Sequence, residues 1–358
     1  MPLSHYITSP GNIFYLTGFQ GSNAFIILAD RKIHLFTDQR YLSEAKVLIP
    51  KKKNNFSIQI HDLKDKLENK LAKIFKKEKI SEINFESNHL TFNEYKKLSK
   101  FIKKTQKDFK LTNIKLKPNP DFIEKMRLIK KPDEIEKIKK AQNIAKKVLT
   151  EIKKELKPGI SEMEIAFKIE FMGRKLGAEN ISFPPIVAFG KNTSIPHHLC
   201  DNTKLKNNDI VLLDFGFKYQ GYCSDMTRTL FTKTPSEKQK KVYETVLKAQ
   251  NEAIKNIKPG ITGQKADSIA RKIIEKAGFK DNFTHSTGHG VGIDIHELPN
   301  LSPNFKKKKN IKLQENMVVT VEPGIYIENE FGVRIEDMIL ITKNGNLNLT
   351  KAKKFTFN

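Results

Sequence analysis

The sequence predicts a mixed α/β protein of two domains, the second of which consists of two related halves. Its 358 residues exceed what one hydrophobic core usually organises. A polar, proline-bearing stretch at 117–120 separates a region of short strands and helices from a region of longer helices. Within the second region, K-P-G-I-S at 157–161 recurs as K-P-G-I-T at 258–262. We therefore expect an N-terminal domain over 1–118 and a C-terminal domain over 119–358.

The N-terminal domain should contain a sheet with helices packed against it. Residues 11–49 alternate short apolar runs with Gly, Asn and Asp, which predicts three or four strands. Leucine and isoleucine recur at helical spacing over 61–78, and this spacing predicts a helix. A short strand at 83–85 and a helix over 93–104 complete the expected domain.

The C-terminal domain opens with a long apolar stripe at helical spacing, which begins after Pro132 and ends before Pro158. The repeat continues past its turn, because Gly177 aligns with Gly278 at the same offset of 101 residues. Each copy therefore predicts a capped helix that ends at a glycine.

In the first half, an apolar strand ends on Asp214 in V-L-L-D-F-G. The dipeptide at 220–221, Gln-Gly, predicts a two-residue hairpin turn that pairs Asp214 with Thr227. Asp214 and Asp225 then lie on one face as diagonal neighbours. Gly216 lies between them, and we expect its missing side chain to leave room for a metal ion.

The second half repeats this pattern in V-T-V-E-P-G, which ends its strand on Glu322. A loop centred near position 330 would pair Gly324 with Glu336. The same loop would pair Tyr326 with Arg334 and turn both glutamates toward one cavity. Gly324 is expected to clear space as Gly216 does.

Four carboxylates around one cavity would repel one another, so their burial requires cations. Two solvent-facing acids on one hairpin would be commonplace, but the recurrence in the second half favours a metal site. His289, in T-G-H-G-V-G, offers a nitrogen ligand. Carboxylates with one imidazole suit Mn²⁺, Co²⁺ or another borderline divalent ion rather than a structural zinc site.

Composition sets limits on other functions. A net charge of +25 is compatible with nucleic-acid binding, and the densest lysine runs lie at 51–53 and 306–309. The other lysines are spread along the chain, so we expect them to form a solvated surface. No apolar run is long enough for a membrane span, and no signal peptide is evident. With only Cys200 and Cys223, a reduced, cytoplasmic protein is expected.

Five motifs in order resemble the metal-dependent "pita-bread" peptidases of family M24, and within them the Xaa-Pro peptidases, prolidase and aminopeptidase P. In chain order they are L-D-F-G with S-D-M-T-R-T, T-G-H-G-V-G, H-E-L-P, V-E-P-G-I-Y and G-V-R-I-E-D. The N-terminal F-Y-L-T-G-F and T-D-Q-R-Y look like the creatinase-type domain that precedes the catalytic domain in this group.

The resemblance implies a role for each matched residue. The five metal ligands would be Asp214, Asp225, His289, Glu322 and Glu336, with Asp225 and Glu336 bridging two ions. Other matched residues would contact substrate or support the site: His197, His296, Tyr326 and Arg334. His198, His285 and both cysteines are expected to have structural roles.

The implied reaction is hydrolysis of an Xaa-Pro bond by a hydroxide that bridges two metal ions, Mn most simply, with Co, Zn or Fe as alternatives. His197 or His296 would stabilise the oxyanion, and Glu322 would carry a proton to the proline nitrogen. A homodimer is expected. Two alternatives stay open: a methionine aminopeptidase-like enzyme, and a non-catalytic pita-bread module that binds nucleic acid or protein.

Overall fold

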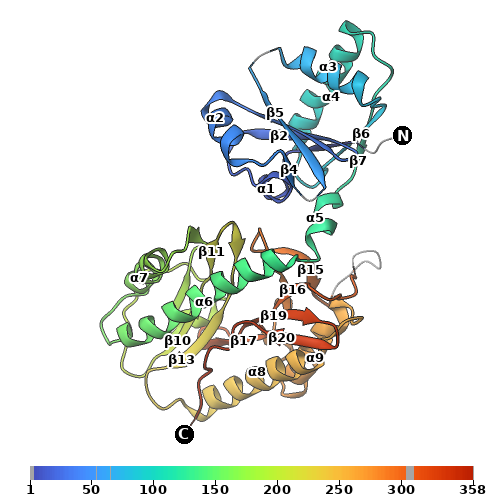
Figure 1. The fold of residues 1–358 in the computed structure, drawn as a ribbon. Helices are drawn as coiled ribbons and strands as arrows, with labels where there is room; N and C mark the ends of the chain where they lie inside the picture. Colours follow the sequence, from blue (N-terminus) through green and yellow to red (C-terminus); the bar gives the residue numbers. More distant parts are fainter. Residues whose placement is uncertain (1–3, 54, 65, 304–309, 358) are drawn as a thin grey trace. The chain divides into compact units, whose positions relative to one another are not determined.

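The structure, a computed structural model, describes residues 4–53, 55–64, 66–303 and 310–357. The chain divides into two compact units, Met1–Met126 and Arg127–Asn358. The lysine run at 306–309 lies outside the described residues. Both units mix helices with strands, so the predicted α/β class is confirmed (Figure 1).

The described residues of the N-terminal unit form a seven-stranded mixed sheet in the order β4-β5-β3-β2-β1-β6-β7. Its strands are β1 (Ser4–Ile7), β2 (Ala24–Ala29), β3 (Lys32–Thr37), β4 (Lys52–Lys53), β5 (Phe56–Asp62), β6 (Glu82–Phe85) and β7 (Lys115–Pro118). The helices are α1 (Pro10–Thr17), α2 (Gln39–Leu48), α3 (Leu67–Lys77) and α4 (Phe92–Asp108), and α5 (Phe122–Arg127) follows at the junction of the units.

One apolar run that was expected to be a strand, I-F-Y-L at 13–16, lies in helix α1, and the same region also contains helix α2. In α1, Pro10 lies in the first turn and Gly18 ends the helix with a left-handed φ of 86°. In α2, the side chain of Asp38 accepts a hydrogen bond from the amide of Arg40 and caps the helix. The prediction was wrong here because apolar runs of four residues fit a buried helix as well as a strand.

The N-terminal unit contains buried histidines, and we therefore predict that acid destabilises it. Burial lowers the pKa of His5 and of His61 to about 4. His61 also shares a hydrogen bond of 3.2 Å with His34, which requires one ring to remain an acceptor. Unfolded histidines bind protons below their ordinary pKa of 6.5, so the stability that these rings contribute is present above pH 6.5 and is lost as the pH falls toward 4.

We therefore expect urea to unfold the N-terminal unit of the full chain at a lower concentration at pH 5 than at pH 7. His61→Phe should reduce this difference, because phenylalanine cannot take up a proton. Leu71→Ala, which destabilises the same unit without removing a titratable group, should leave the difference unchanged. An equal loss of stability in all three proteins would contradict the assignment to buried rings.

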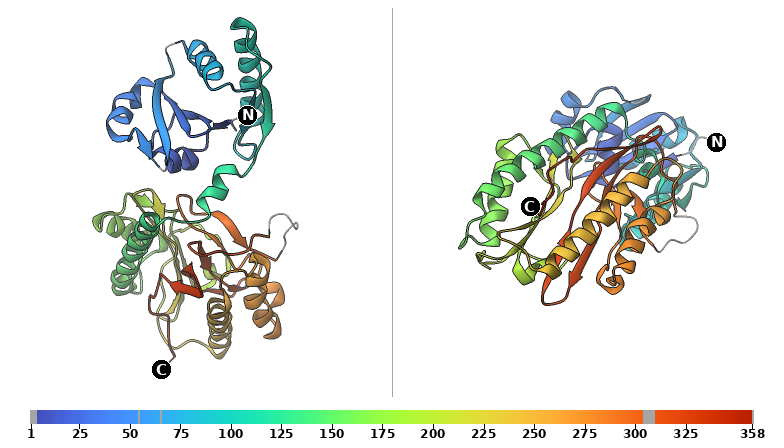
Figure 2. Two further views of the ribbon diagram at one scale, coloured as in Figure 1. Left: turned by 45° about the vertical axis from the view of Figure 1, so that its right-hand side comes forward. Right: turned by 90° about the horizontal axis from the view of Figure 1, so that it is seen from below.

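The C-terminal unit has four main helices among its described residues: α6 (Pro132–Glu155), α7 (Glu162–Lys175), α8 (Glu237–Asn256) and α9 (Gly263–Lys276). In Figures 1 and 2 these helices lie over the strands as two pairs, α6 with α7 and α8 with α9. Strands of the first half are β8 (Asn180–Ile181), β9 (Ile186–Phe189), β10 (Ile210–Asp214), β11 (Phe217–Tyr219), β12 (Tyr222–Cys223) and β13 (Thr227–Phe231).

The second half supplies the remaining strands, and short 3₁₀ turns occur in both halves at 190–194 and 280–282. These strands are β14 (Gly288–Gly290), β15 (Glu297–Leu301), β16 (Val318–Val321), β17 (Gly324–Ile327), β18 (Phe331–Arg334), β19 (Asp337–Thr342) and β20 (Gly345–Asn348). The sheets of the unit run β13-β10-β9, β12-β11-β8, β15-β14-β16-β19-β20 and β17-β18.

The repeated K-P-G-I segments have the same structure in both halves. Gly159 and Gly260 adopt left-handed φ values of 94° and 88°. Their amides donate to the carbonyl oxygens of Leu205 and Leu313, at 2.9 and 2.8 Å. Each segment leads into a helix, α7 or α9, that packs on the preceding one. The prediction of two related halves is therefore confirmed.

Apolar packing holds each helix pair on the strands. The stripe of α6 that the sequence predicts is buried, and Ile138, Val148 and Ile152 have no exposed surface. Full burial of one such side chain stabilises the fold by roughly 1.5–3 kcal/mol. Among the described helices, none combines the length and apolar character needed to cross a membrane.

Candidate metal centre

The first acid pair lies on the hairpin that the sequence predicts. Asp214 pairs with Thr227, and Lys218 pairs with Cys223, as expected. The turn residues at 220–221 both have positive φ, 47° and 78°, which is the geometry of a two-residue turn of the I′ type. Asp214 and Asp225 both line a cavity of about 1230 Å³.

The second acid pair reaches the same cavity with a different register from the one predicted. Gly324 pairs with Arg334, and Tyr326 pairs with Gly332. The loop is centred one residue earlier than expected, on Asn329, whose φ is 61°. This shifts the pairing by two residues, and a shift of two leaves every side chain on its face. Glu322 and Glu336 therefore still line the cavity.

The two glycines of these strands do not clear space for a metal ion, so that prediction was wrong. A Cβ on Gly216 would lie 1.8 Å from the carbonyl oxygen of Ser224. A Cβ on Gly324 would lie 2.6 Å from the hydroxyl oxygen of Tyr326. The glycines instead let a neighbouring backbone and an aromatic ring approach.

His289 meets the acids of both halves. Asp225, His289 and Glu336 each offer one ligand atom, and these atoms lie within 4.8 Å of one another. His289 Nε2 lies 3.3 Å from Glu322 Oε1 and 3.6 Å from Asp225 Oδ2. Its Nδ1 lies 3.0 Å from the carbonyl oxygen of Gly290, which can only accept, so Nδ1 donates and Nε2 faces the acids. Burial lowers the pKa of His289, but the hydrogen bond and negative charge of Glu322, together with Gly290 and Asp214, raise it above the ordinary value.

The buried acids lack partners for part of their oxygens. Asp214 Oδ1, Asp225 Oδ1 and Glu336 Oε1 have no hydrogen-bond partner. Burial raises the pKa of Asp225 and of Glu336 well above their ordinary values, and neighbouring carboxylates raise them further. Orphaned carboxylate oxygens that face one another with an imidazole are the donor set that a divalent cation such as Mn²⁺ takes up, so these residues fit a metal ion.

Arg334 places a guanidinium group among these acids. Its Nη2 donates to Asp214 Oδ2 at 2.6 Å, and its Nη1 donates to the Tyr326 hydroxyl at 2.7 Å. The Tyr326 hydroxyl also lies 2.9 Å from His285 Nε2. Of these, Arg334 and His285 line the cavity, whereas Tyr326 lies behind them.

Both histidines that were expected to contact substrate line the cavity. His296 lies edge-on to the ring of His289, with centroids 4.3 Å apart. His197 lies on the segment before β10, on the wall that carries Pro196. The roles expected for these side chains stay predictions.

The structure gives His198 a partner that the sequence did not indicate. Its Nε2 lies 2.6 Å from Glu162 Oε2, at the start of α7. Glu162 also accepts hydrogen bonds from the amides of Phe189 and Asp201 and from the Asn192 side chain. Glu162, His198 and Asp201 form a second cluster of possible ligands, but the carboxylate of Glu162 is already satisfied, so we assign it to holding the loop. No local motif marks this pair, because 36 residues separate its members.

Comparison with known proteins agrees with this geometry. Residues 136–343 match the model of metallopeptidase family M24, and residues 4–129 match the creatinase/prolidase N-terminal domain. The chain is 37% identical over 344 residues to an Xaa-Pro dipeptidase of Pyrococcus horikoshii, covering 96% of this chain and 91% of that protein.

Two solved structures share the fold. An Xaa-Pro dipeptidase from Bacillus anthracis superimposes with a TM-score of 0.87 at 35% identity, over 99% of this chain and 95% of that chain. An X-Pro aminopeptidase from Thermotoga maritima superimposes with a TM-score of 0.85 at 32% identity, over 99% and 97%. The chain belongs to metallopeptidase family M24. Within this family it is an enzyme of the prolidase and Xaa-Pro aminopeptidase type.

Proposed function

We propose that the protein is a dinuclear metallopeptidase that hydrolyses the bond between an N-terminal residue and proline, in dipeptides or in longer peptides. The observation that carries the proposal is the convergence of four carboxylates from two related halves on one imidazole, three of them buried and that of Glu322 partly buried. They belong to Asp214, Asp225, Glu322 and Glu336, and the imidazole is that of His289. The names of the relatives support an Xaa-Pro substrate rather than the substrate of a methionine aminopeptidase.

These five side chains would hold the ions, with Asp225 and Glu336 shared between them. Both lie among the neighbouring acids, and each has an oxygen without a partner. Bound divalent cations would lower the pKa of water and polarise the scissile carbonyl. We propose Mn²⁺ as the metal, with Co, Zn or Fe as alternatives.

The surrounding side chains would handle the substrate. His197 and His296 can donate hydrogen bonds to an oxyanion that develops in the cavity. Glu322, whose Oε1 lies 3.3 Å from His289 Nε2, can take up a proton and pass it to the leaving proline nitrogen. The wall formed by Phe183, Pro184 and Pro185 offers apolar contact for the proline ring.

We also propose a cytoplasmic homodimer. The cavity mouth carries Phe167 and Leu199, which are 66% and 84% exposed. A second copy of the chain would remove these apolar side chains from water. Both cysteines are free, as in a reducing compartment.

Metal content and substrate preference test the proposed function. The purified protein should contain a divalent transition metal and cleave Ala-Pro or Ala-Pro-Ala at least about 100-fold more efficiently than Ala-Ala, because a site built for one substrate disfavours analogues. Preferred cleavage of Met-Ala-Ser would instead indicate the methionine aminopeptidase-like alternative. A metal-free, inactive protein that shifts RNA in a gel would indicate the non-catalytic alternative.

A further inference from the structure

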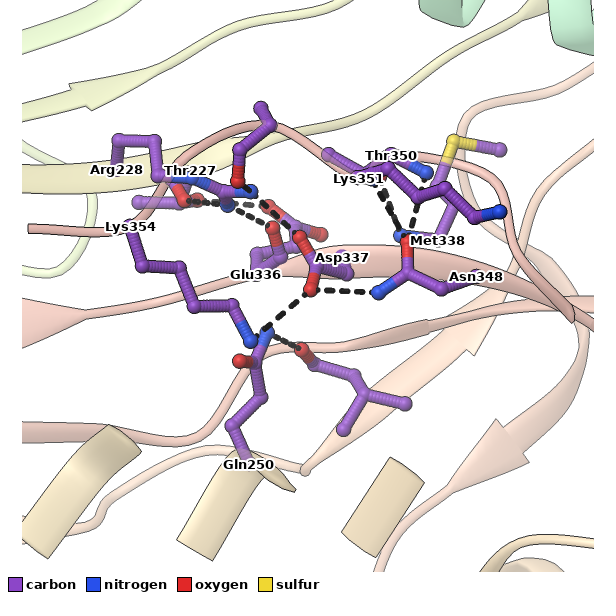
Figure 3. Close-up of polar contacts among 12 residues, drawn as sticks. Thr227, Arg228, Gln250, Glu336, Asp337, Met338, Asn348, Thr350, Lys351 and Lys354 are labelled. Carbon is purple, nitrogen blue, oxygen red and sulfur yellow. Dashed lines mark hydrogen bonds and ion pairs between the residues drawn. The ribbon is translucent and has the colours of Figure 1, made fainter. Parts of the chain in front are cut away.

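A buried charged network lies beside Glu336, one of the proposed metal ligands, and joins the two halves (Figure 3). Arg228 comes from β13 of the first half, and Asp337 comes from β19 of the second. Each residue is 1% exposed, and Arg228 Nη2 lies 2.7 Å from Asp337 Oδ1. The two residues follow Asp225 and Glu336 by three positions and one position, so the pair is close in sequence to both proposed bridging ligands.

Arg228 holds the backbone of Glu336. Its Nη1 donates to the carbonyl oxygens of Thr227, at 2.8 Å, and of Glu336. The Glu336 amide donates in turn to the Thr227 carbonyl at 3.1 Å. The Thr227 hydroxyl then donates to Glu336 Oε2 at 2.7 Å. The main chain and the carboxylate of Glu336 are thus both held by β13, and Oε1 is left free to face the cavity.

The C-terminal segment 348–354 closes the network from the other side (Figure 3). Asp337 Oδ2 accepts a hydrogen bond from Asn348 at 2.9 Å and lies 3.2 Å from Lys354 Nζ. Arg228 Nη2 also donates to the carbonyl oxygen of Ala352 at 2.9 Å. The Thr350 hydroxyl accepts from the amide of Met338, two residues after Glu336. The segment therefore contacts β19, the strand that begins directly after this ligand.

A buried ion pair of this kind is weak evidence for stability, because apolar replacements of similar volume are often as stable. Arginine differs from an apolar residue in presenting several donors in a rigid planar fork. Here that fork meets four acceptors on three separate segments. Such an arrangement determines position more than it adds stability.

We propose that Arg228 and Asp337 are positioning residues for the metal centre, and that segment 348–354 belongs to the same device. The pair holds Glu336 opposite Asp225 before any ion arrives. This inference rests on the metal centre proposed above, and it assigns to the C-terminal segment a part in metal binding although the segment contributes no ligand.

The test measures Mn²⁺ binding to the metal-free full chain by calorimetry, in parallel with its melting temperature. Arg228→Met should weaken Mn²⁺ binding by about 10–100-fold, the range seen when groups that orient metal ligands are lost. Lys354→Met should weaken binding in the same direction. Ile169→Ala, which opens a cavity in α7 away from the network, is the control for lost stability and should leave Mn²⁺ affinity unchanged.

The double variant Arg228→Met/Asp337→Asn separates position from charge. It removes the buried negative charge that loses its arginine partner in Arg228→Met, so it should melt at a higher temperature than Arg228→Met alone while its Mn²⁺ affinity stays low. The proposal would be overturned if the double variant recovered both its melting temperature and its Mn²⁺ affinity. It would also be overturned if Arg228→Met bound Mn²⁺ as tightly as the wild type.

Crystals of the metal-free Arg228→Met variant give a readout that does not depend on a bound ion. The Glu336 carboxylate should have left the Thr227 hydroxyl, and an unchanged hydrogen bond would refute the positioning role. Failure of the wild-type protein to bind any divalent cation would refute the metal centre itself, whatever this hydrogen bond does.

Discussion

Asp225→Asn and Glu336→Gln are each expected to abolish hydrolysis of Ala-Pro. Both carboxylates are buried, and each is proposed to serve two ions, so replacing either one loosens both at once. The loss in kcat/KM should exceed the roughly 10–100-fold that follows removal of a group that only orients a ligand. Steady-state kinetics at saturating Mn²⁺, with metal content measured on the same samples, provides the measurement.

Glu134→Gln is the matched control for this experiment. Glu134 is also a buried acid, 5% exposed, but it accepts hydrogen bonds from the Tyr222 hydroxyl and from the amide of Lys131 at the start of α6. Glutamine can accept the Lys131 bond with its amide oxygen and donate from its amide nitrogen to the Tyr222 hydroxyl oxygen, so activity should be retained. Near-full activity of Asp225→Asn or Glu336→Gln would rule out the assignment of that residue as a bridging ligand.

Local sequence signals were sufficient to predict the register of the first hairpin. The Gln-Gly dipeptide at 220–221 specifies a turn with two positive φ values, and this determines the pairing from Asp214 to Thr227. The second loop, E-N-E at 328–330, has no glycine to mark its centre, and the predicted register was displaced by two residues. The acids were still placed on the correct face, because side chains alternate with a period of two.

Contacts between distant segments could not be predicted in this way. The ion pair of Arg228 with Asp337 joins residues 109 positions apart, and neither has a local pattern that names its partner. The role of Gly216 likewise depends on how closely the carbonyl of Ser224 approaches, which only the folded strands determine. Helix α1 was taken for a strand because four apolar residues carry no periodicity of their own.

The metal-free protein is expected to lose stability as the pH rises, which is the opposite of the acid sensitivity of its N-terminal unit. In the folded chain without a cation, burial and neighbouring charges raise the pKa values of Asp225 and Glu336 well above the ordinary values of 3.8 and 4.5. The folded state therefore binds more protons than the unfolded state between the ordinary and the raised values. Stability contributed by these groups is fully present below the ordinary values and is lost as the pH rises through the raised ones, by about 1.4 kcal/mol per pKa unit of displacement.

A cation should remove this loss, because it stabilises the ionised carboxylates and releases their protons. Melting temperatures of the C-terminal unit in the full chain, measured from pH 5 to pH 8, should fall with pH in chelator and stay level or rise in saturating Mn²⁺. Asp225→Asn in chelator should show a shallower fall, since one of the displaced groups no longer titrates. A metal-free wild type whose C-terminal unit gains stability over this range would mean that the four carboxylates are not held together without a cation, and the preformed site described above would then be wrong.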